Sequence, residues 1–334
     1  MILVTGGLGF IGSHIALSLM AQGQEVVIVD NLSNSDLSNL QRLEYISGMY
    51  IPFVKVDIRN TPALLTVFQQ YSVQSVVHAA GFKSLEESVV KPLEYYNSNV
   101  SCIMSLLRAM QRTGVRSLVH LSSLAVYGKS SLDLKEQEVL NYSFNNPYVK
   151  SQQMIEDIIK DTYLTDPEWK ISVLRLGNIA GAYEGTILGE VVAPLPKNIV
   201  PLAMQVASGQ RDVIELRKDA ETLDKTAERS FLHVLDVCGL VTSTLKWMFH
   251  QSNVYELFNV AGQVVSIQKL LNTISEVTGS PIPTIDSDNF VSEQISQIGT
   301  NSTKAKDILN WVAKKSIQQM IQDEWNFYQN QMNA

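Results

Sequence analysis

The chain has 334 residues, a formal net charge of −7, and a composition that is 45% hydrophobic and 18% charged. These proportions are typical of globular proteins and allow one large domain or two unequal ones. The acidic balance excludes a basic face for nucleic-acid phosphates, and no run of about 18 apolar residues predicts a membrane span.

The start of the chain and its two cysteines both favour a cytoplasmic protein. Residues 1–6 lack the basic segment of a signal peptide. Cys102 and Cys238 lie in apolar patterns without a C-x-x-C motif, so we expect reduced core thiols. Neither a disulfide framework nor a metal site is expected.

Short apolar runs alternate with helical patterns through the first half of the chain. The runs lie at residues 2–4, 26–29, 53–56, 75–78, 117–121 and 171–176. Such runs are typical of parallel strands buried on both faces. One helix face, ending at Gly114, is predicted by the spacing of Leu93, Tyr96, Val100, Ile103, Leu107 and Met110. The alternation predicts right-handed βαβ units and a doubly wound α/β sheet of the Rossmann type.

The pattern becomes irregular after residue 176. Prolines and glycines interrupt residues 177–230, with one short helical stretch near 202–207. Residues 231–234 and 255–260 predict further strands, and 279–283 a turn. We therefore expect residues 1–176 to form a nucleotide-binding domain with a six- or seven-stranded sheet. Residues 177–334 would form a smaller, irregular substrate-binding lobe with strands returning to the sheet.

A glycine-rich turn follows the first predicted strand and precedes a helical pattern. It reads Thr5-Gly6-Gly7-Leu8-Gly9-Phe10-Ile11-Gly12. Glycine allows a tight turn and brings backbone N–H groups close to a pyrophosphate at a helix N-terminus. Asp30 ends the second strand, where an acid accepts hydrogen bonds from ribose and repels a 2′-phosphate. This pattern predicts a dinucleotide site that takes NAD rather than NADP.

Other predicted strands also end in residues suited to a ligand, because open α/β sheets bind ligands at that edge. Asp57 and Ile58 follow the third strand, and the small residues Ala79 and Ala80 follow the fourth. Lys83, a little further on, would meet a phosphate or lie in solvent.

Several further motifs carry a resemblance to a known family. They are Asp30-Asn31, Asp57-Ile58-Arg59-Asn60, Lys91-Pro92-Leu93-Glu94-Tyr95-Tyr96, Ser122-Ser123 with Val126-Tyr127-Gly128, and Asn146-Pro147-Tyr148. With the glycine turn, they make the sequence similar to the UDP-galactose 4-epimerases of the extended short-chain dehydrogenase/reductase family. The resemblance runs nearly end to end and is most specific in the N-terminal half.

The resemblance implies an NAD-dependent isomerase that inverts C4 of a UDP-hexose or UDP-N-acetylhexosamine through a 4-keto sugar. Tyr148 would take the hydroxyl proton and Ser123 would hydrogen-bond the same oxygen. UDP would contact Asn178, Asn198 and Arg229. The family pattern implies cofactor contacts from Gly6, Gly9, Phe10, Ile11, Gly12, Asp30, Asn31, Asp57, Ile58, Ala79, Ala80, Lys83, Asn99, Ser122, Tyr148 and Gly177. It also implies a homodimer, with the helix from residue 93 as core or as subunit contact.

Three positions depart from the family's pattern. Gln152 replaces the lysine four residues after the tyrosine, whose charge lowers the phenol pKa. Val291 and Gln294 stand where the family keeps a pyrophosphate-binding arginine and a ribose-binding aspartate. Arg217 or Lys218 would then substitute for the missing cation.

These departures leave alternatives to a UDP-sugar epimerase. A different nucleotide sugar as the substrate would explain the changed residues at the predicted pyrophosphate and ribose contacts. The coincidence of three replaced residues, Gln152, Val291 and Gln294, in one site supports the alternative of a non-catalytic NAD(H)-binding regulator. A reductase or dehydratase has the same fold, but Leu124 and Ala125 offer no acids for eliminating water. The remaining candidates, His78, His120 and His233, are expected to be neutral core residues with satisfied hydrogen bonds.

Overall fold

The computed structural model describes residues 1–184, 187–191, 196, 198–287 and 295–333. Within these residues the main sheet has seven strands in the order β10-β6-β5-β4-β1-β2-β3, and every neighbouring pair is parallel. The strands are β1 (Ile2–Thr5), β2 (Val26–Asp30), β3 (Phe53–Lys55), β4 (Ser75–His78), β5 (Ser117–Ser123), β6 (Lys170–Leu176) and β10 (Val254–Val260). All seven lie on runs predicted from the sequence, which confirms the doubly wound sheet.

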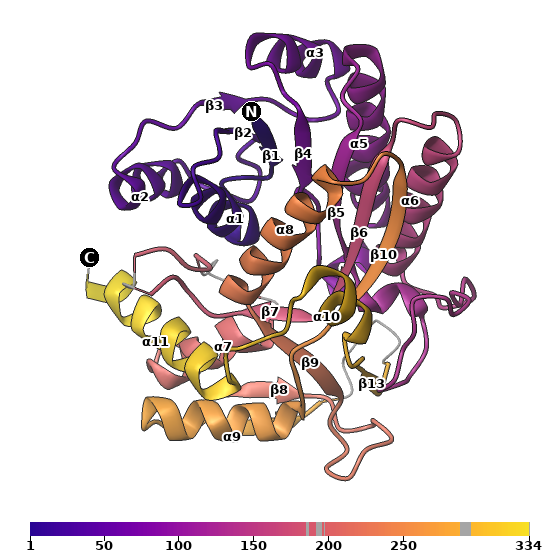
Figure 1. Cartoon of the computed structure of the whole chain (residues 1–334). Coiled ribbons are helices and arrows are strands. Elements are labelled where there is room, and N and C mark those ends of the chain that lie inside the picture. Colours follow the sequence, from indigo (N-terminus) through magenta and orange to yellow (C-terminus); the bar gives the residue numbers. More distant parts are fainter. Residues whose placement is uncertain (185–186, 192–195, 197, 288–294, 334) are drawn as a thin grey trace.

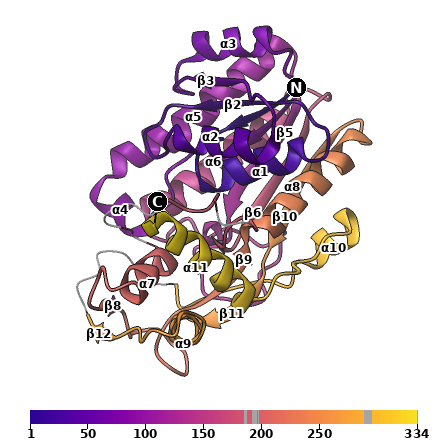
Figure 2. The same cartoon turned by 90° about the vertical axis from the view of Figure 1, so that its left-hand side faces the viewer.

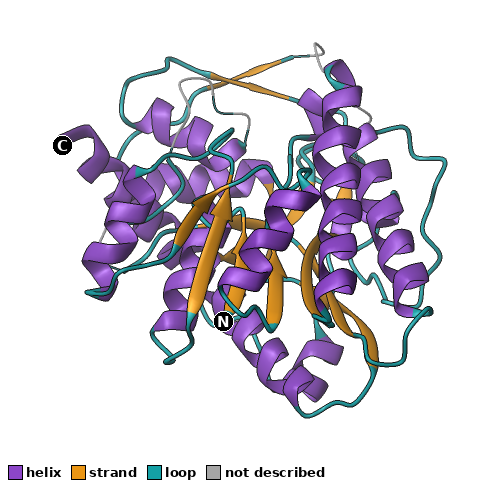
Figure 3. Ribbon diagram, turned by 90° about the horizontal axis from the view of Figure 1, so that it is seen from above, coloured by secondary structure: helices purple, strands orange, loops and turns teal. Residues whose placement is uncertain are grey.

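Helices cover both faces of the main sheet (Figure 3). One face packs against α1 (Phe10–Met20), α2 (Ser38–Ser47) and α8 (Val234–Phe249). The other packs against α3 (Thr61–Gln70), α5 (Pro92–Thr113) and α6 (Pro147–Tyr163). Neighbouring Val4 and Leu3 of β1 belong to these two cores because successive strand side chains point to opposite faces.

The rest of the chain forms a lobe at the carboxyl ends of the main strands (Figures 1 and 2). Its four-stranded sheet, as described, contains β7 (Asn178–Ala180), β9 (Glu228–His233), β11 (Gln263–Ser266) and β13 (Gln297–Ile298). A second pair joins β8 (Ile214–Leu216) to β12 (Thr284–Asp286). Helices α7 (Ile199–Ala207), α9 (Ile267–Thr278), α10 (Thr303–Leu309) and α11 (Ile317–Asn333) complete the C-terminal half.

The chain passes between the main sheet and the lobe at three places. β7 follows β6 after the single residue Gly177, and β9 runs directly into α8. The strand predicted at 231–234 therefore begins earlier, belongs to the lobe sheet, and loses Val234 to the start of α8. Only β10 returns from this half of the described chain to the main sheet.

The helix predicted from residue 93 is α5, and its end is as expected. Gly114 closes it with φ of 75°, the left-handed conformation that glycine adopts readily. Ile103, Leu107 and Met110 are buried, whereas Leu93 is 78% exposed. The predicted apolar face is thus core at its C-terminal end and surface at its start.

Both cysteines are free and buried, as expected. No helix in the described ranges is long and apolar enough to cross a membrane.

Candidate active site

The glycine turn forms a cradle between β1 and α1. Gly6 has φ of 64°, and a Cβ there would lie 2.8 Å from the backbone of Ala80. A Cβ on Gly12 would lie 2.2 Å from the carbonyl oxygen of Gly6. No side chain caps the α1 N-terminus at Gly9, so its first N–H groups are free to bind an anion. These backbone contacts explain why two of the predicted glycines are required.

Gly12→Ala is expected to lower NAD retention at least about tenfold, equivalent to about 1.4 kcal/mol of binding free energy. The new methyl group must displace the carbonyl of Gly6, and with it the N–H groups of the turn. Cofactor released on denaturation, measured per subunit, gives the result. Gly239→Ala in α8 is the matched control, because its Cβ would meet only an atom 3.9 Å away. Normal retention in Gly12→Ala would contradict this role of the turn.

Asp30 lies buried at the end of β2 with one acceptor position open. Its carboxylate accepts hydrogen bonds from the N–H of Leu8 (3.1 Å), the N–H of Leu32 (2.9 Å) and the hydroxyl of Ser35 (2.8 Å). A carboxylate has about four lone-pair sites, so one is left for a ribose hydroxyl.

The residues predicted at the ends of β1 to β4 meet in one cleft. It is lined by Gly6, Gly9, Asp30, Asn31, Asp57, Ile58, Ala79 and Ala80, with Ser33 to Ser35 in addition. Asn31 donates to Asp57 at 3.3 Å. The guanidinium of Arg59 holds the pKa of Asp57 at about 2, so this carboxylate stays ionised. The glycine cradle, the open acceptor on Asp30 and this row of polar side chains fit a dinucleotide.

Lys83 does not lie free in solvent. Its ammonium pairs with Glu190 at 2.7 Å and lies 5.8 Å from the ring centre of Phe10, in the first turn of α1. The amide of Asn198 reaches the same carboxylate at 3.5 Å. Glu190 therefore links a predicted cofactor residue to a predicted substrate residue across the two parts of the molecule. Sequence reasoning missed Glu190 because it lies in a segment without periodicity.

Three residues predicted to contact the cofactor make interactions within the scaffold. Asn99 holds the backbone N–H and carbonyl of Phe82 at 2.8 and 3.1 Å. Ser122 donates to the buried Glu156 at 2.6 Å. A Cβ on Gly177 would lie 2.8 Å from Ser230, so packing alone requires glycine. Their contacts to a cofactor therefore stay a prediction.

Ser123 and Tyr148 come together at the carboxyl end of β5. Ser123 caps the 3₁₀ helix η1 (Leu124–Tyr127) by accepting from Ala125 N–H at 3.1 Å, and its side chain lies near enough to the Tyr148 phenol to affect the pKa of that phenol. Burial raises the pKa of the Tyr148 phenol, and the neighbouring Ser123 side chain opposes part of that rise. Among the described groups no cation contributes to this pKa, so the tyrosinate is scarce near neutral pH.

A row of aromatic rings joins Tyr148 to the cofactor cleft. Tyr95 meets the Tyr148 ring edge-on with centres 6.4 Å apart, and Phe82, which lines the cleft, lies 5.4 Å from Tyr95. The Tyr95 hydroxyl accepts from Ser84 N–H at 2.9 Å, which fixes its ring. Tyr95 was predicted only as part of a family motif, and it is buried on α5 with its ring against that of Tyr148.

Gln152 lies one helical turn after Tyr148 on α6, as its spacing predicts. It is buried, and its Oε1 has no hydrogen-bond partner among the described residues. Lys150 points elsewhere and contacts Asn145 at 3.0 Å, so it does not replace the missing charge.

The expectation that the histidines have satisfied hydrogen bonds holds for His78 and His233. It is wrong for His120, whose ring nitrogens both lack partners in the described structure.

The substrate half places Arg229 on β9. Its guanidinium donates to the carbonyls of Glu228 (2.9 Å) and Ser296 (3.3 Å), and burial lowers its pKa to about 10. Asn178 is exposed at the start of β7. Val291 and Gln294 lie outside the described residues. Arg217 and Lys218 pair with Asp219 and Asp286, at 2.8 and 2.7 Å.

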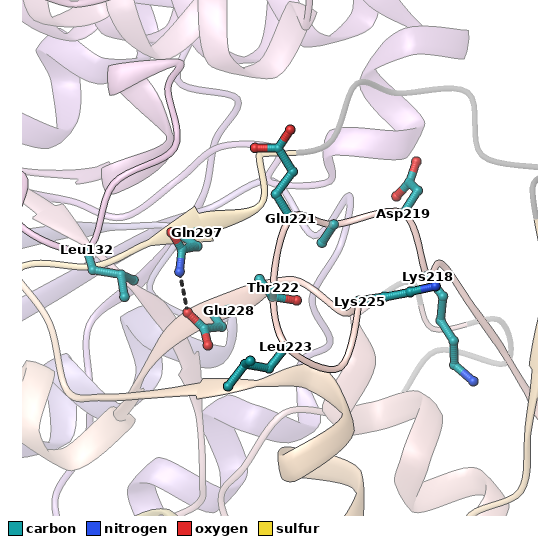
Figure 4. A pocket seen from close by; sticks show the side chains of 10 residues that line it. Leu132, Lys218, Asp219, Glu221, Thr222, Leu223, Lys225, Glu228 and Gln297 are labelled. Carbon is teal, nitrogen blue, oxygen red and sulfur yellow. Dashed lines mark hydrogen bonds between the residues drawn. The ribbon is translucent and has the colours of Figure 1, made fainter.

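A second hollow lies on the lobe near Glu228 (Figure 4). Glu228 accepts from Gln297 at 2.7 Å, and the loop from Lys218 to Lys225 forms the other wall. Because successive side chains of a strand point to opposite faces, this hollow lies across β9 from the side chain of Arg229. Lys218, one of the two residues predicted to substitute for the missing cation, lines this hollow.

Comparison with known proteins identifies the class to which this fold and site belong. Residues 2–261 match the NAD dependent epimerase/dehydratase family. The chain belongs to this family.

Individual relatives match over nearly the whole chain. It is 38% identical to UDP-glucose 4-epimerase 2 of Oryza sativa subsp. japonica, over 98% of this chain and 81% of that protein. It is 33% identical to UDP-glucose 4-epimerase of Neisseria meningitidis serogroup C, over 100% and 98% of the two chains. The crystal structure of UDP-glucose 4-epimerase from Bifidobacterium longum with NAD+ and UDP matches with a TM-score of 0.95 and 30% identity, covering 99% of each chain.

Proposed function

We propose that this protein is an NAD-dependent epimerase that inverts C4 of a UDP-hexose or UDP-N-acetylhexosamine, with UDP-glucose and UDP-galactose the first pair to test. The observation that carries the proposal is that Ser123, at the carboxyl end of β5, and Tyr148, in the first turn of α6, lie close together at the sheet edge where the cofactor cleft opens. The relatives named UDP-glucose 4-epimerase, one of them solved with NAD+ and UDP, support it.

The proposed chemistry assigns to the chain a proton that Tyr148 takes from the substrate and later returns. Bound NAD supplies the acceptor and donor of the hydride at C4. Tyr148, as tyrosinate, takes the proton of the 4-hydroxyl, and Ser123 donates a hydrogen bond to the same oxygen. After the 4-keto sugar has rotated in the site, Tyr148 would return its proton to the 4-oxygen of the sugar, whose C4 then has the opposite configuration. Asn178, Asn198 and Arg229 would hold the UDP part, with Arg229 as the phosphate-binding cation.

The proposal is tested by following UDP-galactose and UDP-glucose by proton NMR. Purified protein without added cofactor should bring either substrate to the same equilibrium mixture. UDP-N-acetylglucosamine and UDP-N-acetylgalactosamine are assayed in parallel to define the sugar. Failure to convert any UDP-sugar, in protein that retains NAD, would reject the proposed activity.

Gln152→Lys is expected to shift the pH profile of kcat to lower pH by about 1–2 units. Only the tyrosinate accepts the proton, so the rate rises as pH passes through the pKa of Tyr148. A cation one turn away lowers that pKa and increases the active fraction at neutral pH about tenfold or more. Gln152→Met is the uncharged control and should leave the profile in place. An unchanged profile in Gln152→Lys would contradict the role given to the phenol pKa.

We also propose that the protein works as a cytoplasmic homodimer. The start of α5 and the adjoining α4 (Leu85–Val90) expose large apolar side chains, including Leu93 at 78% and Val90 at 65%. Exposed apolar groups on neighbouring helices favour burial against a second copy. Sedimentation analysis of the protein and of Leu93→Glu tests this, and a monomeric wild-type protein would reject the dimer.

A further inference from the structure

A buried row of polar side chains crosses the sheet beneath the site. Thr5, His78 and His120 stand in register on the adjacent strands β1, β4 and β5. The Thr5 hydroxyl and His78 Nδ1 are 2.7 Å apart, and the His78 and His120 rings stack with centres 5.4 Å apart. Gln152 of α6 lies within hydrogen-bonding reach of His120. The row therefore connects the strand before the glycine turn to the residue one helical turn after Tyr148.

The last two residues of this row, His120 and Gln152, lie under the site and are both incompletely hydrogen-bonded. His120 and Gln152 are 3% and 7% exposed. Both ring nitrogens of His120 and Oε1 of Gln152 are buried and find no well-aligned partner in the described part of the chain. Buried polar atoms are normally paired, and an unpaired one destabilises the fold. A pairing between these two residues, completed by a small rotation, would satisfy one atom of each.

The orientation of the Gln152 amide follows from which atom is buried. Oε1 of Gln152 is buried without a partner, Gln152 lies within reach of His120, and Nε2 makes no hydrogen bond within the described residues. If Oε1 faces His120, Nε2 is left on the side of Tyr148, one helical turn away. Burial, with a smaller contribution from His78, lowers the pKa of His120 well below its ordinary value. A neutral ring still carries one N–H, which is the donor that Oε1 requires.

We propose that His120 is a positioning residue that donates a ring N–H to Oε1 of Gln152 and so holds the amide NH₂ of Gln152 toward the bound cofactor and Tyr148. The pair supplies a fixed, uncharged donor at this position of α6. Stacking on His78, itself anchored by Thr5, holds the His120 ring. The pair can orient a ribose hydroxyl, but it cannot lower the phenol pKa as a charge would.

The first test is spectroscopic and does not depend on turnover. In a long-range ¹H–¹⁵N spectrum of the full chain, His120 is assigned by His120→Phe among the five histidines. We expect a neutral His120 ring with one slowly exchanging N–H, and Gln152→Leu should move that signal and speed its exchange at least about tenfold, because the hydrogen bond is lost. A His120 signal unaffected by Gln152→Leu would overturn the pairing.

The second test measures energetic coupling and rests on the proposed epimerase activity. Phenylalanine keeps the stack on His78, so His120→Phe should fold. In the natural background it should lower both kcat and NAD retention about fivefold or more, the size expected for one lost hydrogen bond. In the Gln152→Leu background it should change neither, since the partner is already gone. Equal losses in both backgrounds would show a merely structural role and overturn the proposal.

The two tests separate this proposal from the proposed function. The expected change in the His120 signal, in protein that converts no UDP-sugar, would support the His120–Gln152 pair and reject the epimerase. Normal turnover of a UDP-sugar with an unchanged His120 signal would support the epimerase and reject the His120–Gln152 pair.

Discussion

Tyr148→Phe is expected to lower epimerase turnover by a factor of about 10²–10⁴ while the protein keeps its fold and its NAD. The substitution removes one hydroxyl, the proposed proton acceptor, and keeps the ring that packs against Tyr95. The interaction of the phenol with Ser123 is lost with the hydroxyl. The kcat for UDP-galactose and the NAD content per subunit measure the two effects separately.

A matched tyrosine variant provides the control for this result. Tyr142 is half exposed, and its hydroxyl donates to Asp157 at 3.0 Å, away from Ser123. Tyr142→Phe should leave kcat within about twofold of the natural protein, as expected for a surface substitution. If Tyr148→Phe also kept its kcat within about threefold, equivalent to ~0.7 kcal/mol, another group would have to take the proton.

Arg175→Met is expected to destabilise the fold by about 3–5 kcal/mol. Arg175 of β6 pairs with Glu156 of α6 at 2.6 Å, and both side chains are only 4% exposed. Removal of the guanidinium leaves a buried carboxylate whose remaining side-chain partner, among the residues that the structure describes, is Ser122. It also removes the donor to the Tyr127 hydroxyl at 2.7 Å. Chemical denaturation measures the change in unfolding free energy.

Two variants define the origin of this loss. The exposed pair Lys135–Asp133 is the control, and Lys135→Met should change stability by no more than about 1 kcal/mol. Replacing both buried partners, Glu156→Met with Arg175→Met, should restore part of the loss because no charge remains buried. A loss of less than about 1 kcal/mol in Arg175→Met would contradict the assigned burial of the pair.

The main sheet could be predicted from sequence because each buried parallel strand is a short apolar run with its own local signal. Gly114, Asp30 and the glycine turn were also predicted, since each depends on residues adjacent in the chain. The lobe could not be predicted in this way. β7, β8, β12 and β13 are two or three residues long, too short to show a period. Their positions depend on pairing with distant segments, as in the contact of β13 with β9.

The candidate site shows the same division between local and long-range information. The spacing of Tyr148 and Gln152 on one helix placed them on one face, and a family motif placed Ser123 beside them. The ion pair of Lys83 with Glu190 and the contact of His120 with Gln152 join residues that are far apart in the sequence. Sequence reasoning regarded His120 as a satisfied core histidine because position on a strand indicates burial but not hydrogen-bond partners. Such pairings require the tertiary structure.

The fate of a deuterium label at C4 tests the proposed chemistry most directly. UDP-galactose carrying deuterium at C4 is incubated in ordinary water with the purified protein, and the product is analysed by NMR and mass spectrometry. If the hydride leaves C4 and returns within one site while Tyr148 handles only the hydroxyl proton, UDP-glucose forms with deuterium retained at C4. Loss of the label to water, or absence of product from protein that contains NAD, would contradict the proposed function.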